Sequence, residues 1–204
     1  ARLLSKVQQV CIRHGGFVTE AEWFDSVAFG IFPAEASAMD PQQRMLLESA
    51  YETLHSKGHT KDSLMGDPIG ICTGISTIDF NSIAPESPLL GLNTHSVASG
   101  RVSFMLGIQG PCISVDTACS TSLVAVHISA RLLQNHECPV SIASCVNALV
   151  ALSSSVTVAT LQMTALSGRC HTFDRRAEGY ARSEGCSSAL LQLAACGIGG
   201  AAAE

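Results

Sequence analysis

The spacing of apolar residues predicts a helix in the first third of the chain. Leu46, Ala50 and Leu54 recur at every fourth position, which places them on one helix face. Asp40 precedes this run and has a side chain suited to cap the first turn. Gly58 follows the run and is the predicted C-cap. The pattern therefore indicates an amphipathic helix with apolar residues facing a core.

Short apolar runs alternate with helical patterns through the rest of the chain. The segment 76–93 contains two prolines and few periodic apolar residues, so we expect it to be mostly loop. We predict strands over 69–74, 112–115, 140–143 and 186–193, helices over 96–106 and 119–133, and a helix or irregular connection over 153–163. This alternation is typical of an α/β architecture with a largely buried sheet.

Composition and charge narrow the class of protein. The 204 residues are 47% hydrophobic and 14% charged, which suits one globular domain or part of a larger one. Lys and Arg number 12 against 17 Asp and Glu, giving a net charge of -5, so nucleic acid and anionic membrane surfaces are poor expected partners. The apolar runs fall short of the roughly 20 residues that span a bilayer, so we expect no transmembrane helix.

Nine cysteines raise the question of disulfides and metal sites. Their number is odd, the sequence opens without a signal-peptide pattern, and it contains neither a C-x-x-C pair nor a His/Cys cluster at zinc spacing. We therefore expect a reducing, intracellular compartment, cytoplasmic or plastid, with no bound metal. Most of the thiols are expected to pack as small apolar groups.

One cysteine stands apart because of its position. Cys119 lies where the strand predicted over 112–115 gives way to the following helix. A helix N-terminus has unpaired N–H groups and a partial positive charge, which stabilise a thiolate and an oxyanion formed beside it. Asp116, three residues earlier, is expected to brace the turn. We therefore predict that Cys119 is a nucleophile and that its backbone N–H contributes to an oxyanion hole.

The segment Asp116-Thr-Ala-Cys-Ser-Thr-Ser-Leu123 resembles the active-site signature of the β-ketoacyl synthases, the condensing enzymes of fatty acid and polyketide assembly. The resemblance extends over residues 13–193, with further blocks in family order and at family-like spacing. These blocks are 24–31, 39–44, 99–111, 168–174 and 178–185. Ser144 and Cys145 stand where the family commonly has a glycine pair, so we expect them to crowd a close backbone approach.

The resemblance implies a thiolase-like, layered αβαβα fold, of which this chain supplies only the N-terminal half. Residues 1–193 are expected to form this half of a β-ketoacyl synthase domain, and residues 194–204 a separate Gly/Ala-rich tail. A complete domain of this kind is about twice as long. We therefore expect the chain to be part of a longer polypeptide and to expose an apolar half-interface when alone.

The resemblance also implies a reaction and its partners. Cys119 corresponds to the cysteine that accepts an acyl chain from a phosphopantetheine thioester on an acyl carrier protein. A malonyl thioester then loses carbon dioxide and attacks the bound acyl group in a decarboxylative Claisen condensation. No cofactor is expected to bind the chain directly, because the phosphopantetheine belongs to the carrier. The complete enzyme is expected to be a homodimer with the strand over 112–115 near its two-fold axis.

The condensation step in this family uses two histidines and a lysine from the C-terminal half. The His-Gly-Thr-Gly-Thr and Asn-Ile-Gly-His blocks that contain the histidines do not occur here. His127, slightly over two helical turns after Cys119, is expected to be a core histidine, and His95, His136 and His171 to have no catalytic role. Two alternatives therefore stay open: a non-catalytic fragment acting as a dimerisation or scaffold unit, and a cysteine hydrolase using Cys119 with a local histidine.

Other charged residues in these blocks have structural interpretations. We expect Arg101, Glu178 and Glu184 to make structural hydrogen bonds. Arg44, Glu48 and Glu52 lie at helical spacing and are expected to form a solvated face with local ion pairs.

Overall fold

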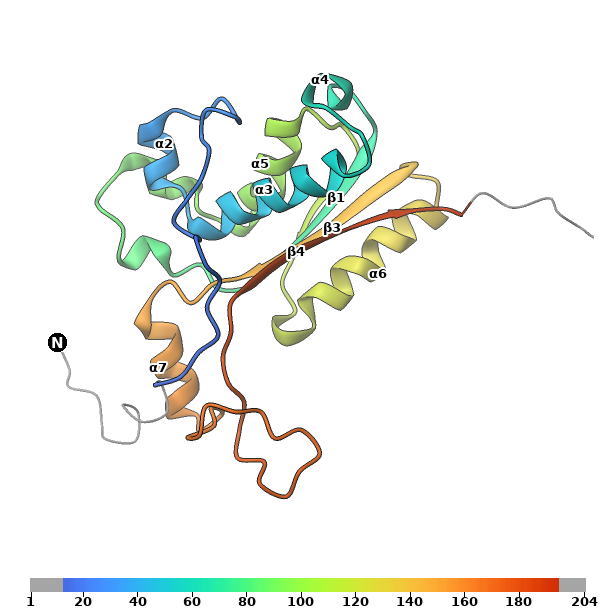
Figure 1. Cartoon of the computed structure of the whole chain (residues 1–204). Coiled ribbons are helices and arrows are strands. Elements are labelled where there is room, and N and C mark those ends of the chain that lie inside the picture. Colours follow the sequence, from blue (N-terminus) through green and yellow to red (C-terminus); the bar gives the residue numbers. More distant parts are fainter. Residues whose placement is uncertain (1–12, 195–204) are drawn as a thin grey trace, which may run out of the picture.

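A computed structural model describes residues 13–194 and contains one four-stranded sheet with the order β2-β1-β3-β4 (Figure 1). The central strands β1 and β3 run parallel to each other, and β2 runs parallel to β1. Strand β4 is antiparallel to β3. The strands are β1 (Ile69–Ile75), β2 (Cys112–Val115), β3 (Val140–Asn147) and β4 (Gly185–Gln192). The expected α/β class is confirmed, with one antiparallel edge strand added to a parallel sheet.

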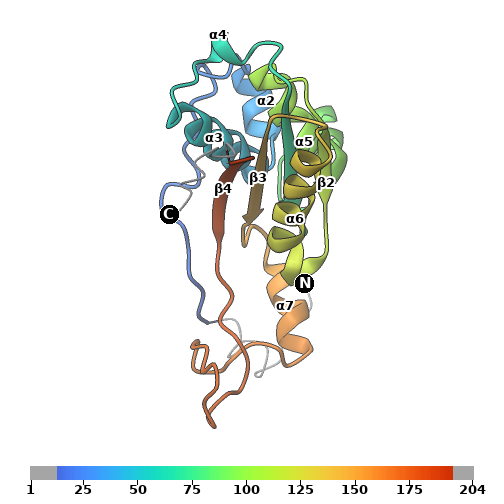
Figure 2. The same ribbon diagram turned by 90° about the vertical axis from the view of Figure 1, so that its right-hand side faces the viewer.

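Three longer helices cover the sheet. Helices α3 (Pro41–His55) and α5 (His95–Leu106) pack on one face, and α6 (Thr121–Gln134) packs on the other (Figures 1 and 2). The remaining helices and turns are α2 (Pro33–Ala38), α4 (Lys61–Leu64), α7 (Leu152–Thr160), η1 (Phe80–Ser82), η2 (Pro88–Leu92) and η3 (Ala118–Ser120). The segment between α7 and β4 projects beyond the end of the sheet (Figure 2).

Side chains of β1 alternate between the two faces of the sheet, so this one strand contributes to the apolar core on both faces. Ile71 and Ile75 belong to the larger core shared with α3 and α5, whereas Cys72 joins a smaller cluster with Ala125 of α6 and Ala143 of β3. Because successive side chains of a strand point to opposite faces, a strand buried on both sides must be apolar at consecutive positions. Every residue of β1 is buried, as the continuous apolar run predicted.

The predicted helix after Met39 is confirmed together with its N-cap. Asp40 Oδ1 accepts a hydrogen bond of 2.8 Å from the Gln42 N–H. The predicted C-cap is wrong: the helix ends at His55 with Ser56 as its C-cap, and Gly58 lies in the next turn with a φ of 88°. The left-handed Gly58 instead closes the turn after the helix, where the Gly58 N–H donates to the His55 carbonyl over 2.9 Å and the His59 N–H to the Leu54 carbonyl over 3.3 Å.

Tertiary pairing sets the other boundaries. Strand β3 runs four residues beyond the predicted end at 143 because β1 and β4 pair along both of its sides as far as Val146 and Asn147. The predicted helix over 153–163 is α7, and the predicted final strand is β4. The sequence patterns did not predict the short helices α2 and α4. The segment 76–93 is irregular apart from η1 and η2.

The prediction of a largely buried sheet holds for β1 and β3 and is wrong for its edges. Residues of β2 and β4 are partly or fully exposed. On α6, Leu123 has an exposed fraction of 75%, so the helix presents an apolar residue away from the sheet. The expected apolar half-interface stays a prediction. The predicted tail over 195–204 lies outside the described residues.

Candidate active site

The turn between β2 and α6 holds Cys119. The α-helix was expected to begin at this cysteine, but Cys119 lies in the 3-10 turn η3 and α6 begins at Thr121. Ala118, the residue before the cysteine, has a φ of 54°, in the left-handed region that side chains disfavour. This conformation interrupts the helical path for one turn, and the Cys119 residue is exposed.

Four hydrogen bonds hold this strained turn. The Ala118 N–H donates to Asp116 Oδ1 over 2.9 Å, which confirms the expected bracing role of Asp116. The hydroxyl of Thr121 accepts from the Thr117 N–H over 2.9 Å and donates to the Ala118 carbonyl over 2.7 Å. The Ser120 hydroxyl donates to the Thr117 carbonyl over 2.9 Å. The turn is therefore fixed from both its strand side and its helix side.

The bond from Ala118 has an electrostatic consequence. It is the largest cause that lowers the pKa of the Asp116 carboxyl below its ordinary value, and Ser76 and His95 lower it further. A hydrogen bond to the charged form of a carboxyl group favours that form. Asp116 is thus a carboxylate at neutral pH beside the cysteine turn.

The floor under the turn is made by Gly74, Thr121 and Cys145. A Cβ atom placed on Gly74 would lie 2.6 Å from Cys145 Sγ and 2.7 Å from Thr121 Cγ2. The expected crowding at Cys145 is therefore confirmed, and the absence of a side chain at Gly74 relieves it. Burial raises the pKa of the Cys145 thiol, so this sulfur is a neutral packing group.

An open cleft of about 670 Å³ begins at this turn. Its walls come from the carboxyl ends of β1 and β3, the start of α6, and the segment that leads into β4. Its lining includes Gly74, Cys119, Thr121, Cys145, Tyr180 and Arg182. Cys119 therefore opens onto a space large enough for an extended organic chain.

The described cysteines differ sharply in their surroundings. All seven are free thiols; Cys72 and Cys138 are buried, whereas Cys112, Cys119 and Cys170 are exposed. Burial raises the pKa of Cys72 to about 12 and that of Cys186 to about 11. Cys119 is the exposed thiol that lines the cleft.

The histidines do not surround this cysteine. His127 is exposed on α6, so the prediction of a core histidine is wrong. The cleft has no histidine among its lining residues within the part of the chain that the structure describes. This arrangement does not favour a hydrolase that pairs Cys119 with a local histidine. Nor do residues 13–194 contain three or more His, Cys, Asp or Glu side chains grouped to hold a metal ion.

The expected structural roles of three charged residues are confirmed. Arg101 donates to Gln43 Oε1 over 3.0 Å and pairs with Glu35. Glu178 accepts from the Ser167 N–H over 2.9 Å. Glu184 accepts from two backbone N–H groups, those of Val18 and Leu149.

Arg44, Glu48 and Glu52 were predicted to form a solvated helix face, and this prediction is wrong for Arg44 and Glu48. Both are partly buried. Burial lowers the pKa of the Arg44 guanidinium and raises that of the Glu48 carboxyl. Helical spacing predicted that these residues share one face of the helix. It could not predict how far neighbouring segments bury that face.

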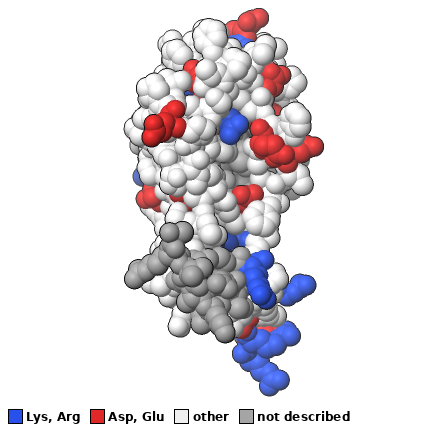
Figure 3. Space-filling view, turned by 90° about the vertical axis from the view of Figure 1, so that its left-hand side faces the viewer, with Lys and Arg blue, Asp and Glu red and all other residues white. Residues whose placement is uncertain are grey.

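Charge is segregated along the molecule. Most Lys and Arg side chains visible in Figure 3 gather at its lower end, whereas Asp and Glu predominate above. This end is formed by the segment between α7 and β4, which contains Arg169, Arg175, Arg176 and Arg182. Arg182 also lines the cleft, where its Nη1 donates to the hydroxyls of Ser154 and Ser155 over 3.1 and 2.8 Å. The segment 161–184 also contains Asp174, Glu178 and Glu184, and Asp174 pairs with Arg176, so four arginines against three acidic residues give it a net charge of +1.

A strand, a strained cysteine turn and a helix on an α/β sheet suit a nucleophilic enzyme, and the likeness to solved ketosynthase domains gives the fold as thiolase-like. Residues 5–195 match the family described as "Beta-ketoacyl synthase, N-terminal domain". The chain belongs to the β-ketoacyl synthase family and corresponds to the N-terminal part of its domain.

Similar proteins support this assignment. The chain is 42% identical over 186 residues to a phenolphthiocerol/phthiocerol polyketide synthase of Mycobacterium tuberculosis, covering 87% of the chain and 10% of that relative. It is 39% identical over 186 residues to erythronolide synthase EryA3 of Saccharopolyspora erythraea, covering 88% and 6%. The ketosynthase from module 6 of the bacillaene synthase of Bacillus subtilis 168 has a TM-score of 0.82 at 30% identity, covering 88% of this chain and 31% of that one. The chain thus spans a small part of each relative.

Within the described residues, no helix is long and apolar enough to cross a membrane.

Proposed function

We propose that this chain supplies the nucleophile of a polyketide-type ketosynthase and that Cys119 accepts the acyl group. The thiolate of Cys119 attacks the carbonyl carbon of a carrier-bound acyl thioester. The new C–S bond forms, the bond to the phosphopantetheine sulfur breaks, and that sulfur leaves as a thiolate that takes up a proton from solvent. The observation that carries the proposal is the exposed thiol at the mouth of the cleft, on a turn held in a strained conformation.

The backbone beside the thiol suits the oxyanion formed in this step. The 3-10 turn is closed by N–H groups of Ser120 and Thr121, which donate to the carbonyls of Thr117 and Ala118. The Cys119 N–H lies outside this pattern, so it is available to donate to the oxygen that becomes negative during attack. The N-terminus of α6 adds its partial positive charge. We propose that a second donor comes from outside this chain.

The partner is proposed to be an acyl carrier protein that presents its phosphopantetheine arm to the cleft. The phosphodiester of such an arm is an anion, and the cation that lines the cleft is Arg182, in a segment with four arginines and three acidic residues. Opposite charges arranged in this way steer association and fix orientation. No cofactor is proposed to reside in the chain itself. Cytoplasmic or plastid localisation rests on the cysteine pattern of the sequence and stays a prediction.

The second step, decarboxylative condensation with a malonyl thioester, needs groups beyond Cys119. The cleft lacks a histidine lining among the described residues, so we propose that the histidines and lysine of this step come from the C-terminal half of the domain. Homodimerisation is proposed across β2, because this strand is an edge of the sheet and pairs with β1 on one side only. An unpaired strand edge is a ready site for pairing with another chain.

Selective labelling tests the nucleophile. The full-length protein is exposed at pH 8 to an acyl thioester or a cerulenin-like electrophile, and the adduct is located by mass spectrometry. We expect the adduct on Cys119 and its loss in Cys119→Ser, whereas the protonated thiols of Cys72 and Cys186 stay unlabelled because of their high pKa values. Cys170 is the matched control, because it is exposed, lies outside the cleft lining and is not part of β2. Equal labelling of Cys119 and Cys170 would contradict the proposal.

A further inference from the structure

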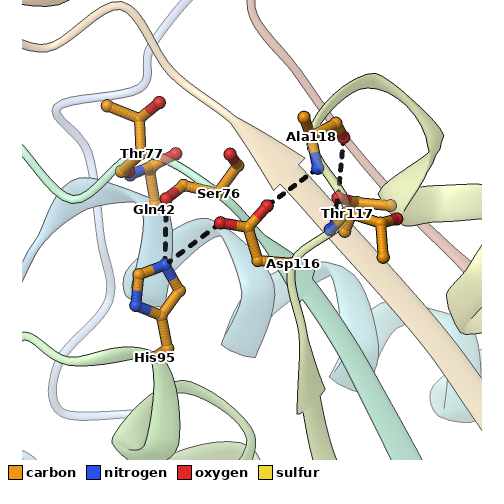
Figure 4. A network of polar contacts seen from close by, with 8 residues as sticks. Gln42, Ser76, Thr77, His95, Asp116, Thr117 and Ala118 are labelled. Atoms are coloured by element: carbon orange, nitrogen blue, oxygen red, sulfur yellow. Dashed lines mark hydrogen bonds and ion pairs between the residues drawn. The ribbon is translucent and has the colours of Figure 1, made fainter.

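A histidine lies next to the carboxylate that braces the cysteine turn. His95 is the first residue of α5, and its ring reaches the point where β1 and β2 end (Figure 4). Its Nε2 atom is 2.9 Å from the Ser76 carbonyl oxygen and 3.9 Å from Asp116 Oδ2. Three segments that are far apart in the sequence therefore converge beside the turn, because the carboxyl ends of parallel strands lie at the same edge of a sheet.

The contact with Ser76 determines which nitrogen of the ring carries hydrogen. A backbone carbonyl only accepts hydrogen bonds, so the hydrogen of His95 must be on Nε2. The same nitrogen lies 3.9 Å from Asp116 Oδ2, beyond hydrogen-bond distance, so its attraction to the carboxylate is electrostatic. Because the Ser76 carbonyl fixes the ring, its orientation toward the carboxylate does not depend on Asp116 itself.

The two oxygens of Asp116 serve different neighbours. Oδ1 accepts the hydrogen bond from the Ala118 N–H, and Oδ2 faces His95 (Figure 4). The Asp116 side chain has an exposed fraction of 41%, so water competes for both oxygens. Asp116 is the one acidic side chain within 4.0 Å of a His95 ring nitrogen among residues 13–194. The Ser76 side chain also hydrogen-bonds this carboxyl group, so Ser76 and His95 together orient the carboxylate whose other oxygen holds the strained residue before Cys119.

We propose that His95 is a positioning residue for the nucleophile, acting through Asp116 on the Ala118–Cys119 turn. Ala118 adopts a left-handed conformation that is unfavourable for a residue with a side chain. The turn keeps it only while neighbouring groups hold its N–H. Loss of the His95 contact frees the carboxylate to rotate toward water, and Cys119 then samples more than one orientation. This proposal rests on the proposed acyl transfer to Cys119.

The test compares two substitutions of the same residue in the full-length protein. His95→Ala removes the side chain, whereas His95→Gln keeps an N–H donor at a similar reach. We expect His95→Ala to lower kcat for acyl transfer about tenfold, a loss of about 1.4 kcal/mol, with KM for the thioester and the Tm unchanged. His95→Gln should restore most of the rate. His59→Gln is the control, because His59 precedes α4, near the opposite end of β1 from the site.

Alkylation of Cys119 by iodoacetamide provides a readout that does not depend on acyl transfer. If the wild type fails to transfer an acyl group, the proposed function fails, and the alkylation rates of the His95 variants still test the positioning role. A fall in Tm with no change in either rate would show a merely structural role for His95. Equal rates in the wild type and His95→Ala, or no recovery in His95→Gln, would overturn the proposal.

Discussion

Gly74 is the residue on which the floor of the cysteine turn depends most directly. It is the last residue but one of β1, opposite Cys145 of β3, and both Cys145 and Thr121 occupy the space that a side chain would need. Thr121 in turn bonds the backbone of Thr117 and Ala118. Because Gly74 has no side chain, Thr121 can take the position from which it bonds the backbone on either side of Ala118 and so helps to place Cys119.

We expect Gly74→Ala to destabilise the protein by about 1–3 kcal/mol and to slow acylation of Cys119. The added carbon would overlap a sulfur and a methyl group in a packed region, and overpacking of this kind forces neighbours to shift. Urea unfolding gives the free energy, and mass spectrometry gives the acylation rate.

Gly100→Ala is the matched control for this substitution. A Cβ on Gly100 meets no atom within 4 Å, and the residue lies inside α5, so we expect an increase in stability of about 0.5–1 kcal/mol. The double substitution Gly74→Ala with Cys145→Gly should recover part of the loss, because it removes the sulfur. A Gly74→Ala variant as stable and as reactive as the wild type would contradict this account.

At the scale of elements, α3 illustrates the conflict between capping and burial. Asp40 accepts the hydrogen bond from the Gln42 N–H that begins the helix, yet its exposed fraction is 0%. Its second oxygen, Oδ2, is buried without a hydrogen-bond partner among the described residues. Burial is the largest cause that raises the pKa of the Asp40 carboxyl, and Asp79 raises it further, whereas the bonds to Gln42 lower it. The helix is therefore capped by a carboxyl group whose charged form is disfavoured by burial.

We expect Asp40→Asn to be at least as stable as the wild type at pH 7. A carboxyl whose pKa is raised on folding binds its proton more tightly in the folded state, so its contribution to stability falls as the pH rises from about 4. Asparagine caps a helix as well as aspartate does and has no charge to bury. The advantage of the Asn variant should therefore shrink toward pH 4, as urea unfolding at several pH values would measure.

Asp40→Ala is the control that removes the cap itself. We expect it to lose about 1 kcal/mol at both pH values, because the Gln42 N–H is left without its acceptor. An Asn variant that is as destabilised as the Ala variant at pH 7 would show that the negative charge of Asp40 stabilises the fold.

At the scale of the whole molecule, Glu184 joins segments that are far apart in the chain. Its carboxylate accepts from the Val18 N–H over 3.1 Å and from the Leu149 N–H over 2.8 Å. Its backbone N–H donates to the Gly16 carbonyl over 2.8 Å. The beginning of the described chain, the end of β3 and the approach to β4 are thereby tied at one point beside the cleft.

We expect Glu184→Ala to destabilise the protein by about 1–3 kcal/mol, because two partly buried N–H groups lose a charged acceptor. Glu184→Gln, which keeps one carbonyl acceptor, should lose less. Glu178→Ala is the control, since Glu178 accepts one exposed bond from Ser167 and should change the free energy of unfolding by about 0.5 kcal/mol or less. Equal losses in the free energy of unfolding for Glu184→Ala and Glu178→Ala would show that Glu184 does not hold these segments together.

The sequence alone determined the elements whose signals are local. The four-residue period over Leu46, Ala50 and Leu54 and the continuous apolar run of β1 predicted α3 and a buried strand. Hydrogen bonds within a helix and burial of consecutive strand residues involve positions close together in the chain. A short stretch of sequence is therefore enough to predict such an element. The motif around Cys119 likewise identified the family, which the comparisons confirmed.

Only the tertiary structure decided where these local elements meet. The length of β3 depends on two neighbouring strands, and the antiparallel direction of β4 depends on the projecting segment that precedes it. The contact of His95 with Asp116 and the packing of Cys145 on Gly74 join residues from separate elements. Such contacts follow from how the sheet stacks strand ends, and no periodicity along the chain encodes them. The sequence alone predicted the nucleophilic cysteine, whereas only the tertiary structure showed which side chains pack and bond around its turn.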